Sequence, residues 1–432
     1  MLHVPFLIIG AGPTGLGAAA ALTARGMPHL LVDAGPGPGG MAASRRDDHG
    51  FTWDLGGHVI HSHFREFDDA VAASGVPLRH VRRNGWVWVE GSTPESMVPA
   101  PLQAQLQALP EDVRPEAPAA NLAEYYRNCF GADLYERFFH GYNTKMWSTP
   151  LEHVDHTWTS LRSGGSGRNV PTLSLAKDFR PSTERFPYPV GGTRALWEGI
   201  AEQLTDVGSQ RYDTSVTAVD LEHHQAVLAD GERVSYQHLI STAPLPWLLR
   251  QAGRDDLAKG LRASRERAVG LGFDGAPPAA LREVTWMYCP DPQVPFSRAT
   301  VMSTYDPGAA GDGRWSILLE VPEWEEQVLG EQEASEACLE ALARLGVERE
   351  SLVSTWSEQV PMAYPVPTIG RDDILRRADA YLTERDVYSR GRFGGWRYES
   401  CNQDYSWMQG LQAVDAALTG SAEDVLWEPE RF

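Results

Sequence analysis

The chain has 432 residues, a length that suits two or three domains or one large α/β body with insertions. Apolar residues make up 42% and charged residues 22%, as in folded domains, which excludes disordered, collagen-like and disulfide-scaffold proteins. The 58 acidic residues outnumber the 38 basic ones and give a net charge of -20. We therefore expect no surface for nucleic acid or anionic lipid, and any phosphate group must be bound locally.

The four cysteines lie far apart and form no C-x-x-C pair, so we expect neither a zinc site nor a disulfide framework. The apolar run 4–9 has no basic segment before it and is too short for a signal-peptide core. No stretch approaches the roughly 18 apolar residues of a membrane span. We therefore expect a cytoplasmic protein that does not enter a membrane.

A strand, a glycine-rich turn, a helix and a second strand are predicted over residues 3–33. Gly10 permits the tight turn, Gly12 lets the backbone approach a pyrophosphate, and Gly15 allows the helix to pack on the strand. Asp33 follows the second strand, where a carboxylate can accept hydrogen bonds from a ribose. The spacing predicts a Rossmann-like dinucleotide site with the pyrophosphate at a helix N-terminus.

Two more glycine pairs follow, in the segments 39–42 (GGMA) and 54–58 (DLGGH). Paired glycines let the main chain lie against a flat ligand. A dinucleotide fold with a nearby GG-[ML]-A turn resembles the FAD-binding family that includes amine oxidases, protoporphyrinogen oxidase and sugar mutases. The resemblance implies FAD, rather than NAD, as the tightly bound cofactor. The candidate cofactor-binding residues are Gly10, Gly12, Gly15, Asp33, Gly39, Gly40, Gly57, Val219 and Gln403.

The rest of the chain alternates between helical and strand-rich stretches. Residues 60–185 are predicted to form mostly helices and loops. Beyond them, short buried strands are predicted at 216–221, 226–228, 238–244, 299–303 and 315–321, and a helix is predicted at 331–345. We predict an α/β protein in which a Rossmann-like FAD-binding domain is interleaved with a helical substrate domain and a substrate-facing antiparallel sheet. The predicted segments are 1–75, 186–265 and 371–432 (FAD-binding), 76–185 (mainly helical) and 266–370 (sheet).

The C-terminal segment 388–399, YSRGRFGGWRYE, resembles UDP-galactopyranose mutases, the eukaryotic type more than the short bacterial type. Further matches are CNQD at 401–404, GGHVI at 56–60, NTKMW at 143–147, PFSRAT at 295–300 and YPVPT at 364–368. Because these motifs occur in order along nearly the whole chain, the resemblance covers the fold as well as the site.

The resemblance implies a redox-neutral isomerisation of a nucleotide-diphosphate hexose between its pyranose and furanose forms. Reduced flavin would attack the anomeric carbon through N5 and expel the diphosphate, and NADPH or NADH would reduce the flavin. The partner of the protein would therefore be a nucleotide-diphosphate sugar.

Negative charge grows on the leaving diphosphate, so the mechanism requires cations and hydroxyl groups beside it. The resemblance implies that Arg298 and Arg162 are the cations. It implies that the hydroxyl groups of Tyr364 and Tyr398 contact the diphosphate, and that His58 lies beside the flavin ring. The other candidate substrate-binding residues are Trp147 (an aromatic wall beside the sugar), Asn143, Gln103, Ala100, Tyr288, His61, Arg392 and Asn402.

Some positions depart from the family's pattern. The family carries aromatic residues where this chain has Ala100 and Leu102, and the first of them stacks on or packs beside uracil. Losing this ring removes a stacking partner and opens space that a single pyrimidine would leave empty. His61 replaces a usual phenylalanine, while Gln103 and Tyr288 are kept. We therefore expect a preference for a GDP-linked over a UDP-linked hexose.

Two other functions stay open from the sequence: an oxidoreductase of the amine oxidase class, and a flavoprotein that binds a nucleotide-sugar without turnover. An amine oxidase does not need diphosphate-binding arginines, which favours the mutase. Histidines at 58, 61 and 63 do not converge on one point, so we predict no metal site. The sequence leaves open whether the chain forms a homo-oligomer.

Overall fold

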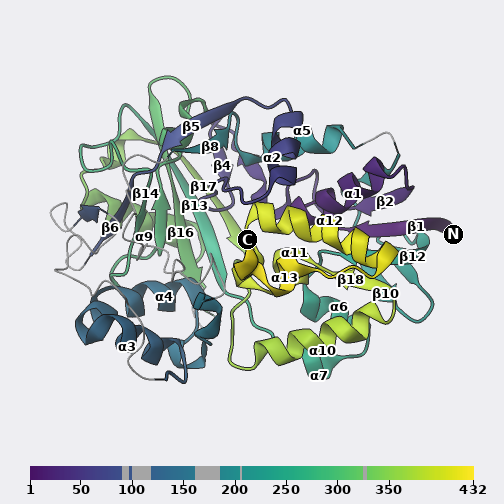
Figure 1. The fold of residues 1–432 in the computed structure, drawn as a ribbon. Helices are drawn as coiled ribbons and strands as arrows, with labels where there is room; N and C mark the ends of the chain where they lie inside the picture. Colours follow the sequence, from purple (N-terminus) through teal and green to yellow (C-terminus); the bar gives the residue numbers. More distant parts are fainter. Residues whose placement is uncertain (90–96, 100–117, 161–184, 205–206, 325–327) are drawn as a thin grey trace.

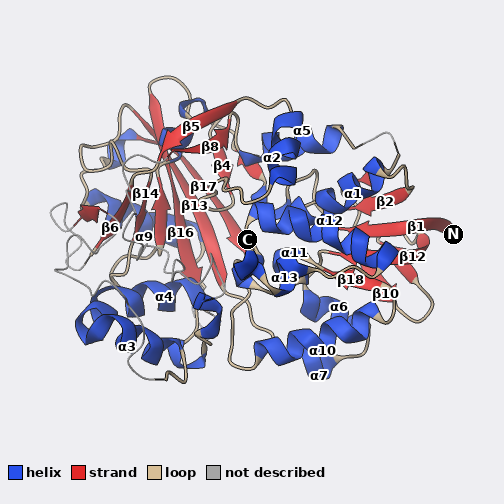
Figure 2. Cartoon of the chain, viewed as in Figure 1, coloured by secondary structure: helices blue, strands red, loops and turns tan. Residues whose placement is uncertain are grey.

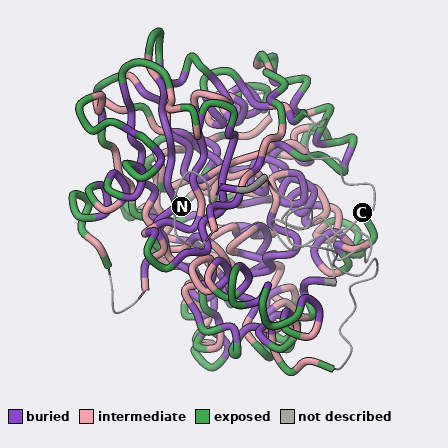
Figure 3. Tube along the Cα trace, turned by 90° about the vertical axis from the view of Figure 1, so that its left-hand side faces the viewer, coloured by how far each residue is buried: buried purple, intermediate pink, exposed green. Residues whose placement is uncertain are grey.

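The structure is a computed structural model and describes residues 1–89, 97–99, 118–160, 185–204, 207–324 and 328–432. Two large sheets lie in neighbouring bodies, each with helices around it (Figures 1 and 2). Both ends of the chain and the central segment 193–258 contribute to one body, and the strands between residues 85 and 99 and between 265 and 360 form the sheet of the other. Buried residues follow the sheets and the helices that face them, while exposed residues gather on the outer helices and loops (Figure 3).

The first sheet has seven strands with β1 near its centre. Its strands are β1 (Leu2–Ile9), β2 (His29–Val32), β9 (Ser209–Arg211), β10 (Val216–Asp220), β11 (Gln225–Leu228), β12 (Arg233–Ser241) and β18 (Val387–Ser389). β1 pairs in parallel with β2 and β12, β2 with β9, and β12 with β18, whereas β10, β11 and β12 are antiparallel neighbours. The parallel β1-α1-β2 unit is the predicted Rossmann-like unit.

The helices of this body are α1 (Pro13–Ala24), α2 (Arg65–Ala73), α5 (Thr193–Glu202), α6 (Leu245–Gln251), α7 (Asp255–Ala258), α10 (Arg371–Thr383), α11 (Gly391–Gly394), α12 (Gln403–Thr419) and α13 (Asp424–Trp427). α1 and α12 approach so closely that two glycines are required. A Cβ at Gly17 would lie 2.3 Å from the carbonyl oxygen of Trp407, and one at Gly410 would lie 2.1 Å from that of Thr14. This contact joins the N-terminal and C-terminal segments.

The second sheet also has seven strands, in the order β17-β13-β16-β15-β14-β6-β7. They are β6 (Gly85–Trp88), β7 (Met97–Pro99), β13 (Arg265–Asp274), β14 (Trp286–Tyr288), β15 (Arg298–Thr300), β16 (Arg314–Glu323) and β17 (Leu352–Val360). All neighbours are antiparallel except β14 and β6. The helices α8 (Met302–Tyr305) and α9 (Glu331–Ala343) belong to this part of the chain.

One face of β13 carries small residues and packs against two aromatic rings. A Cβ at Gly270 would lie 2.6 Å from the ring of Trp53, and one at Gly272 would lie 2.5 Å from the ring of Phe51. Both rings belong to the segment around β4 (Thr52–Asp54), which pairs with β3 (Ser44–Arg46). The opposite face of β13 carries larger apolar side chains that share a core with α9. Both faces of β13 are therefore covered.

A helical segment, α3 (Leu122–Leu134) and α4 (His140–Trp147), closes the lower left of the molecule in Figure 1. The side chain of Asn121 caps α3 by accepting a hydrogen bond from the Glu124 N–H at 3.0 Å. A further two-stranded sheet, β5 (Leu78–Arg82) and β8 (Arg185–Pro189), marks the point where the chain returns from this region.

The predicted fold class is confirmed, but the segment predicted as mostly helices and loops also contains the strands β5, β6 and β7. The strand β6 is stabilised by pairing with β14, whose residues lie about two hundred positions further along, so local sequence gives little sign of it. The strand predicted at 299–303 ends at Thr300, and a short helix begins at Met302. The boundaries of the five predicted segments stay a prediction.

Candidate active site

A cavity of about 720 Å³ opens where the glycine-rich turn of α1 faces the C-terminal segment. Its described lining residues are Gly12, Pro13, Thr14, Asp33, Gly40, Met41, Ala42, His58, Thr242, Gly391, Arg392, Phe393, Cys401, Gln403 and Ser406. The cavity thus begins at the N-terminus of α1, where free backbone N–H groups favour an anion.

Three glycines of the turn have distinct steric roles. A Cβ at Gly10, which has a φ of 100°, would lie 1.9 Å from Thr242 Oγ1, and one at Gly15 would lie 1.8 Å from the Gly10 carbonyl oxygen. Gly10 and Gly15 are therefore required for close packing. At Gly12 the nearest atom to a Cβ is 3.9 Å away, so a side chain there would project into the cavity.

Asp33 both shapes the turn and lines the cavity. Its Oδ2 accepts a hydrogen bond from the Ala11 N–H at 2.6 Å, and its Oδ1 accepts one from the Gly35 N–H at 2.7 Å. Each carboxylate oxygen keeps a second lone pair, so a ribose hydroxyl can still donate to Asp33. The position agrees with the ribose contact expected from the sequence.

Gly40 lines the next part of the cavity, and Gly39 and Gly40 both have positive φ values, 109° and 54°. The Gly39 N–H donates to the Ala11 carbonyl oxygen at 2.9 Å, which ties this turn to the first one. Val219 lies elsewhere: it is buried on β10 in the core between the sheet and α6, away from the residues that line the cavity.

A second cavity, of about 1140 Å³, adjoins the first. The two share Met41, His58, Arg392, Cys401 and Gln403 among their lining residues. These five residues therefore mark the boundary at which a ligand in one cavity lies next to a ligand in the other. The other described lining residues are Leu55, Gly56, Gly57, Val59, His61, Arg83, Glu266, Trp286, Tyr288, Arg298, Thr300, Tyr305, Tyr364, Tyr398 and Asn402.

Arg298 is held from one side by Glu320 of the neighbouring strand. The Oε1 atom of Glu320 lies 2.8 Å from Nε and 2.7 Å from one terminal nitrogen of Arg298. Burial alone would lower the pKa of Arg298, but the Glu320 carboxylate and the surrounding tyrosines together outweigh burial and raise the pKa well above its usual range. The guanidinium group is therefore permanently charged, and it lines the cavity.

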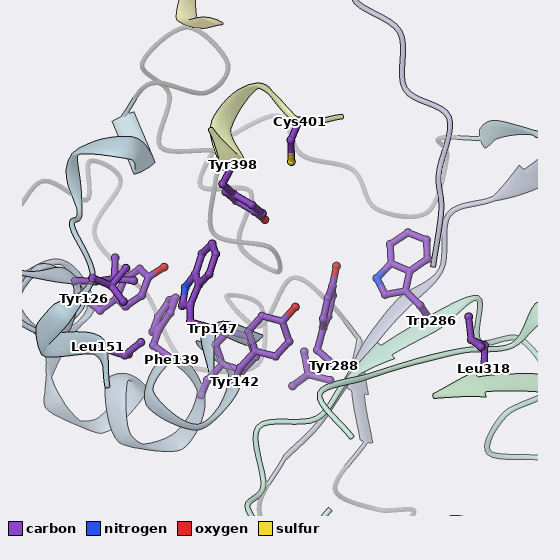
Figure 4. Close-up of a cluster of buried hydrophobic side chains, with 14 of the residues drawn as sticks. Tyr126, Phe139, Tyr142, Trp147, Leu151, Trp286, Tyr288, Leu318, Tyr398 and Cys401 are labelled. Carbon is purple, nitrogen blue, oxygen red and sulfur yellow. The ribbon is translucent and has the colours of Figure 1, made fainter. Parts of the chain in front are cut away.

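Several aromatic side chains close the far side of this cavity. In Figure 4 the hydroxyl groups of Tyr142, Tyr288 and Tyr398 and the sulfur of Cys401 point into one common space. Tyr364 stands edge-on to Tyr398, with 5.6 Å between ring centroids. Burial raises the pKa of Tyr364 and of Tyr288, so both side chains keep their protons and can donate hydrogen bonds.

Trp147 and Asn143 lie behind this wall rather than in it. Trp147 is fully buried, and its ring meets that of Tyr398 edge-on at 4.9 Å. The Asn143 amide donates to the Phe139 carbonyl oxygen at 2.9 Å within α4. Neither residue is among those that line the cavity. Both were predicted to contact substrate, which stays a prediction; in the structure Trp147 packs against Tyr398, which lines the cavity.

The C-terminal motif divides into site residues and supporting residues. Arg392 lines both cavities, and its guanidinium carbon lies 5.2 Å from the Tyr364 ring centroid. Arg390 is instead bonded to Glu423 and Asp379. Arg397 is also engaged elsewhere, bonded to Glu399 of the same motif. Only tertiary structure separates these three arginines.

Four candidate residues from the sequence line the second cavity: His58, His61, Asn402 and Gln403. His58 Nδ1 lies 3.8 Å from Asp54 Oδ2 at the boundary of the two cavities. The Gln403 amide oxygen is buried and accepts no hydrogen bond from any described residue. It is thus a polar atom left for a bound ligand.

Four predicted positions lie outside the described residues: Arg162, Ala100, Leu102 and Gln103. Across the ranges that the structure describes, no group of three histidine, cysteine or acidic side chains could hold a metal ion. No helix within the same ranges is long and apolar enough to cross a membrane.

Sequence reasoning missed Glu266, Glu320, Thr300 and Cys401. Thr300 and Cys401 fall within quoted motifs and could have been included. The two glutamates lie on β13 and β16 without a motif. A usable signal for Glu266 is the alternation on β13, where a carboxyl group stands on the small-residue face with Ala268.

The crystal structure of a reduced UDP-galactopyranose mutase is 34% identical to this chain, covers 99% of this chain and 98% of that one, and has a TM-score of 0.88. The chain belongs to the UDP-galactopyranose mutase family. It is a UDP-galactopyranose mutase-like isomerase, and the resemblance noted from the sequence motifs is confirmed. The broader family model of flavin containing amine oxidoreductases matches residues 13–418.

More distant solved structures share the fold of this mutase family member. A protein assigned as protoporphyrinogen oxidase from Exiguobacterium sp. is 16% identical, with coverage of 97% and 99% and a TM-score of 0.73. Wild-type putrescine oxidase is 14% identical, with coverage of 96% and 99% and a TM-score of 0.68. Identities of 14% and 16% show a shared fold alone. The 34% identity, by contrast, shows membership of the mutase family.

Proposed function

We propose that the chain binds FAD in the first cavity and a nucleotide-diphosphate hexose in the second, and interconverts the pyranose and furanose forms of the sugar. The observation that carries the proposal is the boundary between the cavities. His58, Arg392, Cys401 and Gln403 line both, so the reactive ring of a cofactor and the anomeric carbon of a sugar can meet there.

The residues of the first cavity fit FAD. The space beside Gly12 at the N-terminus of α1 suits a pyrophosphate, and Asp33 suits a ribose. The unpartnered Gln403 oxygen suits a polar edge of the flavin ring. Bound FAD in its reduced form would supply a nucleophilic nitrogen for the anomeric carbon.

In the second cavity, this chain's own residues would bind and stabilise the diphosphate. Arg298 is fixed in place by Glu320 and remains charged at every working pH, so it can hold the phosphate oxygens as their charge grows. The hydroxyl groups of Tyr364 and Tyr398 would donate hydrogen bonds to the same oxygens. The predicted contribution of Arg162 is part of this proposal and rests on the motif resemblance.

For the base, the proposal keeps the GDP-linked hexose suggested by Ala100 and Leu102. The relative at 34% identity is named for a UDP-sugar, whose base is uracil. Guanine, a purine, is larger than uracil and would use the space that the small side chain of Ala100 leaves. A competition titration of oxidised protein with UDP and GDP decides between them. Tighter GDP binding supports the proposal, whereas tighter UDP binding overturns this part of it. Stacking on an aromatic is worth roughly 1–3 kcal/mol, so an Ala100→Tyr variant should gain at least several-fold in UDP affinity.

The function itself is tested by turnover. Protein reduced with dithionite, or with NADPH or NADH as the proposed reductants, is incubated with UDP- or GDP-galactose and the products are separated by chromatography. A new nucleotide-sugar peak with reduced protein, and none with oxidised protein, is expected. Hydrogen peroxide formed with an amine substrate, without any nucleotide-sugar product, would favour the amine oxidase alternative.

A further inference from the structure

Glu266 is a buried carboxyl group that faces the second cavity without a partner. It is the second residue of β13, only 8% of its surface is exposed, and it is one of the cavity's lining residues. No described residue forms a hydrogen bond or an ion pair with its carboxyl group. Its carboxyl oxygens are not among the sealed polar atoms of the described residues but reach the cavity space, where a polar group of a bound ligand can form a hydrogen bond with them.

The surroundings of Glu266 combine cations and anions. Glu320 lies diagonally across on β16, because its in-register partner on β13 is Ala268. Arg298 on β15 and Arg392 on α11 interact electrostatically with Glu266. On the other side, β17 places Val360 opposite Glu266, and the nearby Glu358 is bonded to Arg45 at 3.0 Å. The other titratable and charged residues that line the cavity are His58, His61, Arg83, Tyr288, Tyr305, Tyr364, Tyr398 and Cys401.

This environment disfavours the ionised form of Glu266. Burial raises the pKa of Glu266 to about 8, and the Glu320 carboxylate adds to the rise, against the opposing effect of Arg298 and Arg392. The side chain is therefore mostly a neutral carboxylic acid at pH 7, with an O–H group to donate.

We infer that Glu266 is a substrate-binding acid, whose neutral carboxyl group donates a hydrogen bond to the diphosphate of the nucleotide-sugar, so that binding is linked to the proton of Glu266. This inference rests on the proposed function. With Glu266 ionised, Glu266 and Glu320 would cancel the charges of Arg298 and Arg392. With Glu266 neutral, one positive charge remains for the diphosphate.

The number of protons taken up on binding depends on the ionisation of Glu266 in the free protein. When the free protein carries ionised Glu266, binding takes one proton from solvent onto a carboxylate oxygen, and the O–H group then points at a phosphate oxygen. When Glu266 is already protonated, no proton is exchanged. No bond of the sugar or of the diphosphate breaks in this step.

The test is equilibrium binding of UDP-galactose and GDP-galactose to oxidised, FAD-loaded enzyme, which does not turn over. Titration calorimetry from one pH unit below to one above the Glu266 pKa of about 8 gives the affinity, and buffers of different ionisation heat give the proton count. We expect a constant Kd below pH 8, weakening by up to tenfold for each pH unit above it, with proton uptake approaching one.

The Glu266→Gln variant keeps a hydrogen-bond donor but cannot titrate. It should bind as tightly as the wild type at neutral pH, lose the weakening above pH 8 and take up no proton. The matched control is Glu358→Gln, which alters a carboxylate on the neighbouring strand whose partner is Arg45, and it should keep the wild-type pH dependence. FAD absorbance reports that each variant is folded.

The outcomes separate the two proposals. Binding whose Kd and proton count are unchanged in Glu266→Gln overturns the role of Glu266 and leaves the mutase function standing. Failure of both nucleotide-sugars to bind at any pH overturns the proposed function, and the role of Glu266 with it.

Discussion

Glu320 holds Arg298 and the backbone of Gly57 with a single oxygen atom. Its Oε1 lies 2.8 Å from Arg298 Nε and also accepts the Gly57 N–H at 2.8 Å. Gly57 belongs to the loop that carries His58, at the boundary of the two cavities. The carboxylate therefore fixes the cation of the second cavity relative to a loop that borders the first.

Replacing Arg298 by lysine should lower kcat/KM by tenfold or more, about 1.4 kcal/mol, because an ammonium group cannot reproduce the two-pronged contact of a guanidinium. Steady-state kinetics with reduced enzyme measure the effect, and FAD should stay bound. The matched control is Arg267→Lys, in the same sheet, whose arginine pairs with Glu323 at 3.2 Å and does not line the cavity. Equal kinetics of the two variants would remove Arg298 from the site.

Replacing Gly12 by valine should yield folded protein without FAD. Gly12 caps α1 with a φ of -74°, which valine adopts without strain, and its side chain would fill the cavity rather than strike protein atoms. Gly330 caps α9 with a φ of -64° and is also open to a Cβ, so Gly330→Val is the matched control and should keep FAD. The visible flavin spectrum distinguishes them, and full FAD occupancy in Gly12→Val would contradict the assignment.

Replacing Lys145 by methionine should destabilise the protein by on the order of 3 kcal/mol, because four carbonyl groups lose their donor. Lys145 Nζ lies 2.8, 2.6, 2.8 and 3.1 Å from the carbonyl oxygens of Cys289, Asp291, Val294 and Phe296. Denaturant unfolding measures the loss.

The loop that Lys145 binds joins β14, which ends at Tyr288, to β15, which begins at Arg298, so KM should rise as well. Lys259 is exposed, and Lys259→Met should leave both the free energy of unfolding and KM close to the wild-type values. An equal, small effect in both variants would show that Lys145 does not support this loop.

Glu399 should contribute to stability only above acidic pH. It lies 2.7 Å from Arg371 and 2.9 Å from Arg397, and all three side chains are buried. Burial would raise the pKa of Glu399, but the two guanidinium groups outweigh it and hold the pKa below its usual range. The stabilisation is fully present above the unfolded-state pKa of about 4.3 and is lost as the pH falls through the lower folded-state value.

Glu399→Gln should therefore cost about 3–5 kcal/mol at neutral pH, since it leaves buried charges uncompensated. The variant should also lose less unfolding free energy than the wild type as the pH falls, which urea unfolding between neutral and acidic pH measures. The exposed Glu340→Gln is the control and should change neither. If the unfolding free energy of Glu399→Gln fell with pH as steeply as that of the wild type, another carboxylate would be the cause of the acid sensitivity.

The sequence predicted the glycine-rich turn that borders the first cavity because the geometry of that turn is local. Gly10, Gly12 and Gly15 are close in the chain, and their spacing alone defines a turn that leads into a helix. Most of the residues taken from the mutase motifs also reached the second cavity, among them Arg298, Tyr364 and Asn402. Trp147 and Asn143 do not line the second cavity, and Val219 does not line the first, because a sequence pattern identifies a segment and not the direction of each side chain.

By itself the sequence determined the class of fold, the glycine turns and the family, since these depend on spacing and on order along the chain. Tertiary structure decided which charges act at the site. Arg390 and Arg392 are two positions apart, yet one is neutralised by Glu423 and Asp379 while the other faces the cavities. Likewise the pKa of Glu266 is raised first by burial and then by Glu320, 54 positions away. Burial and the field of distant charges arise only when the chain has folded, so no local pattern can reveal them.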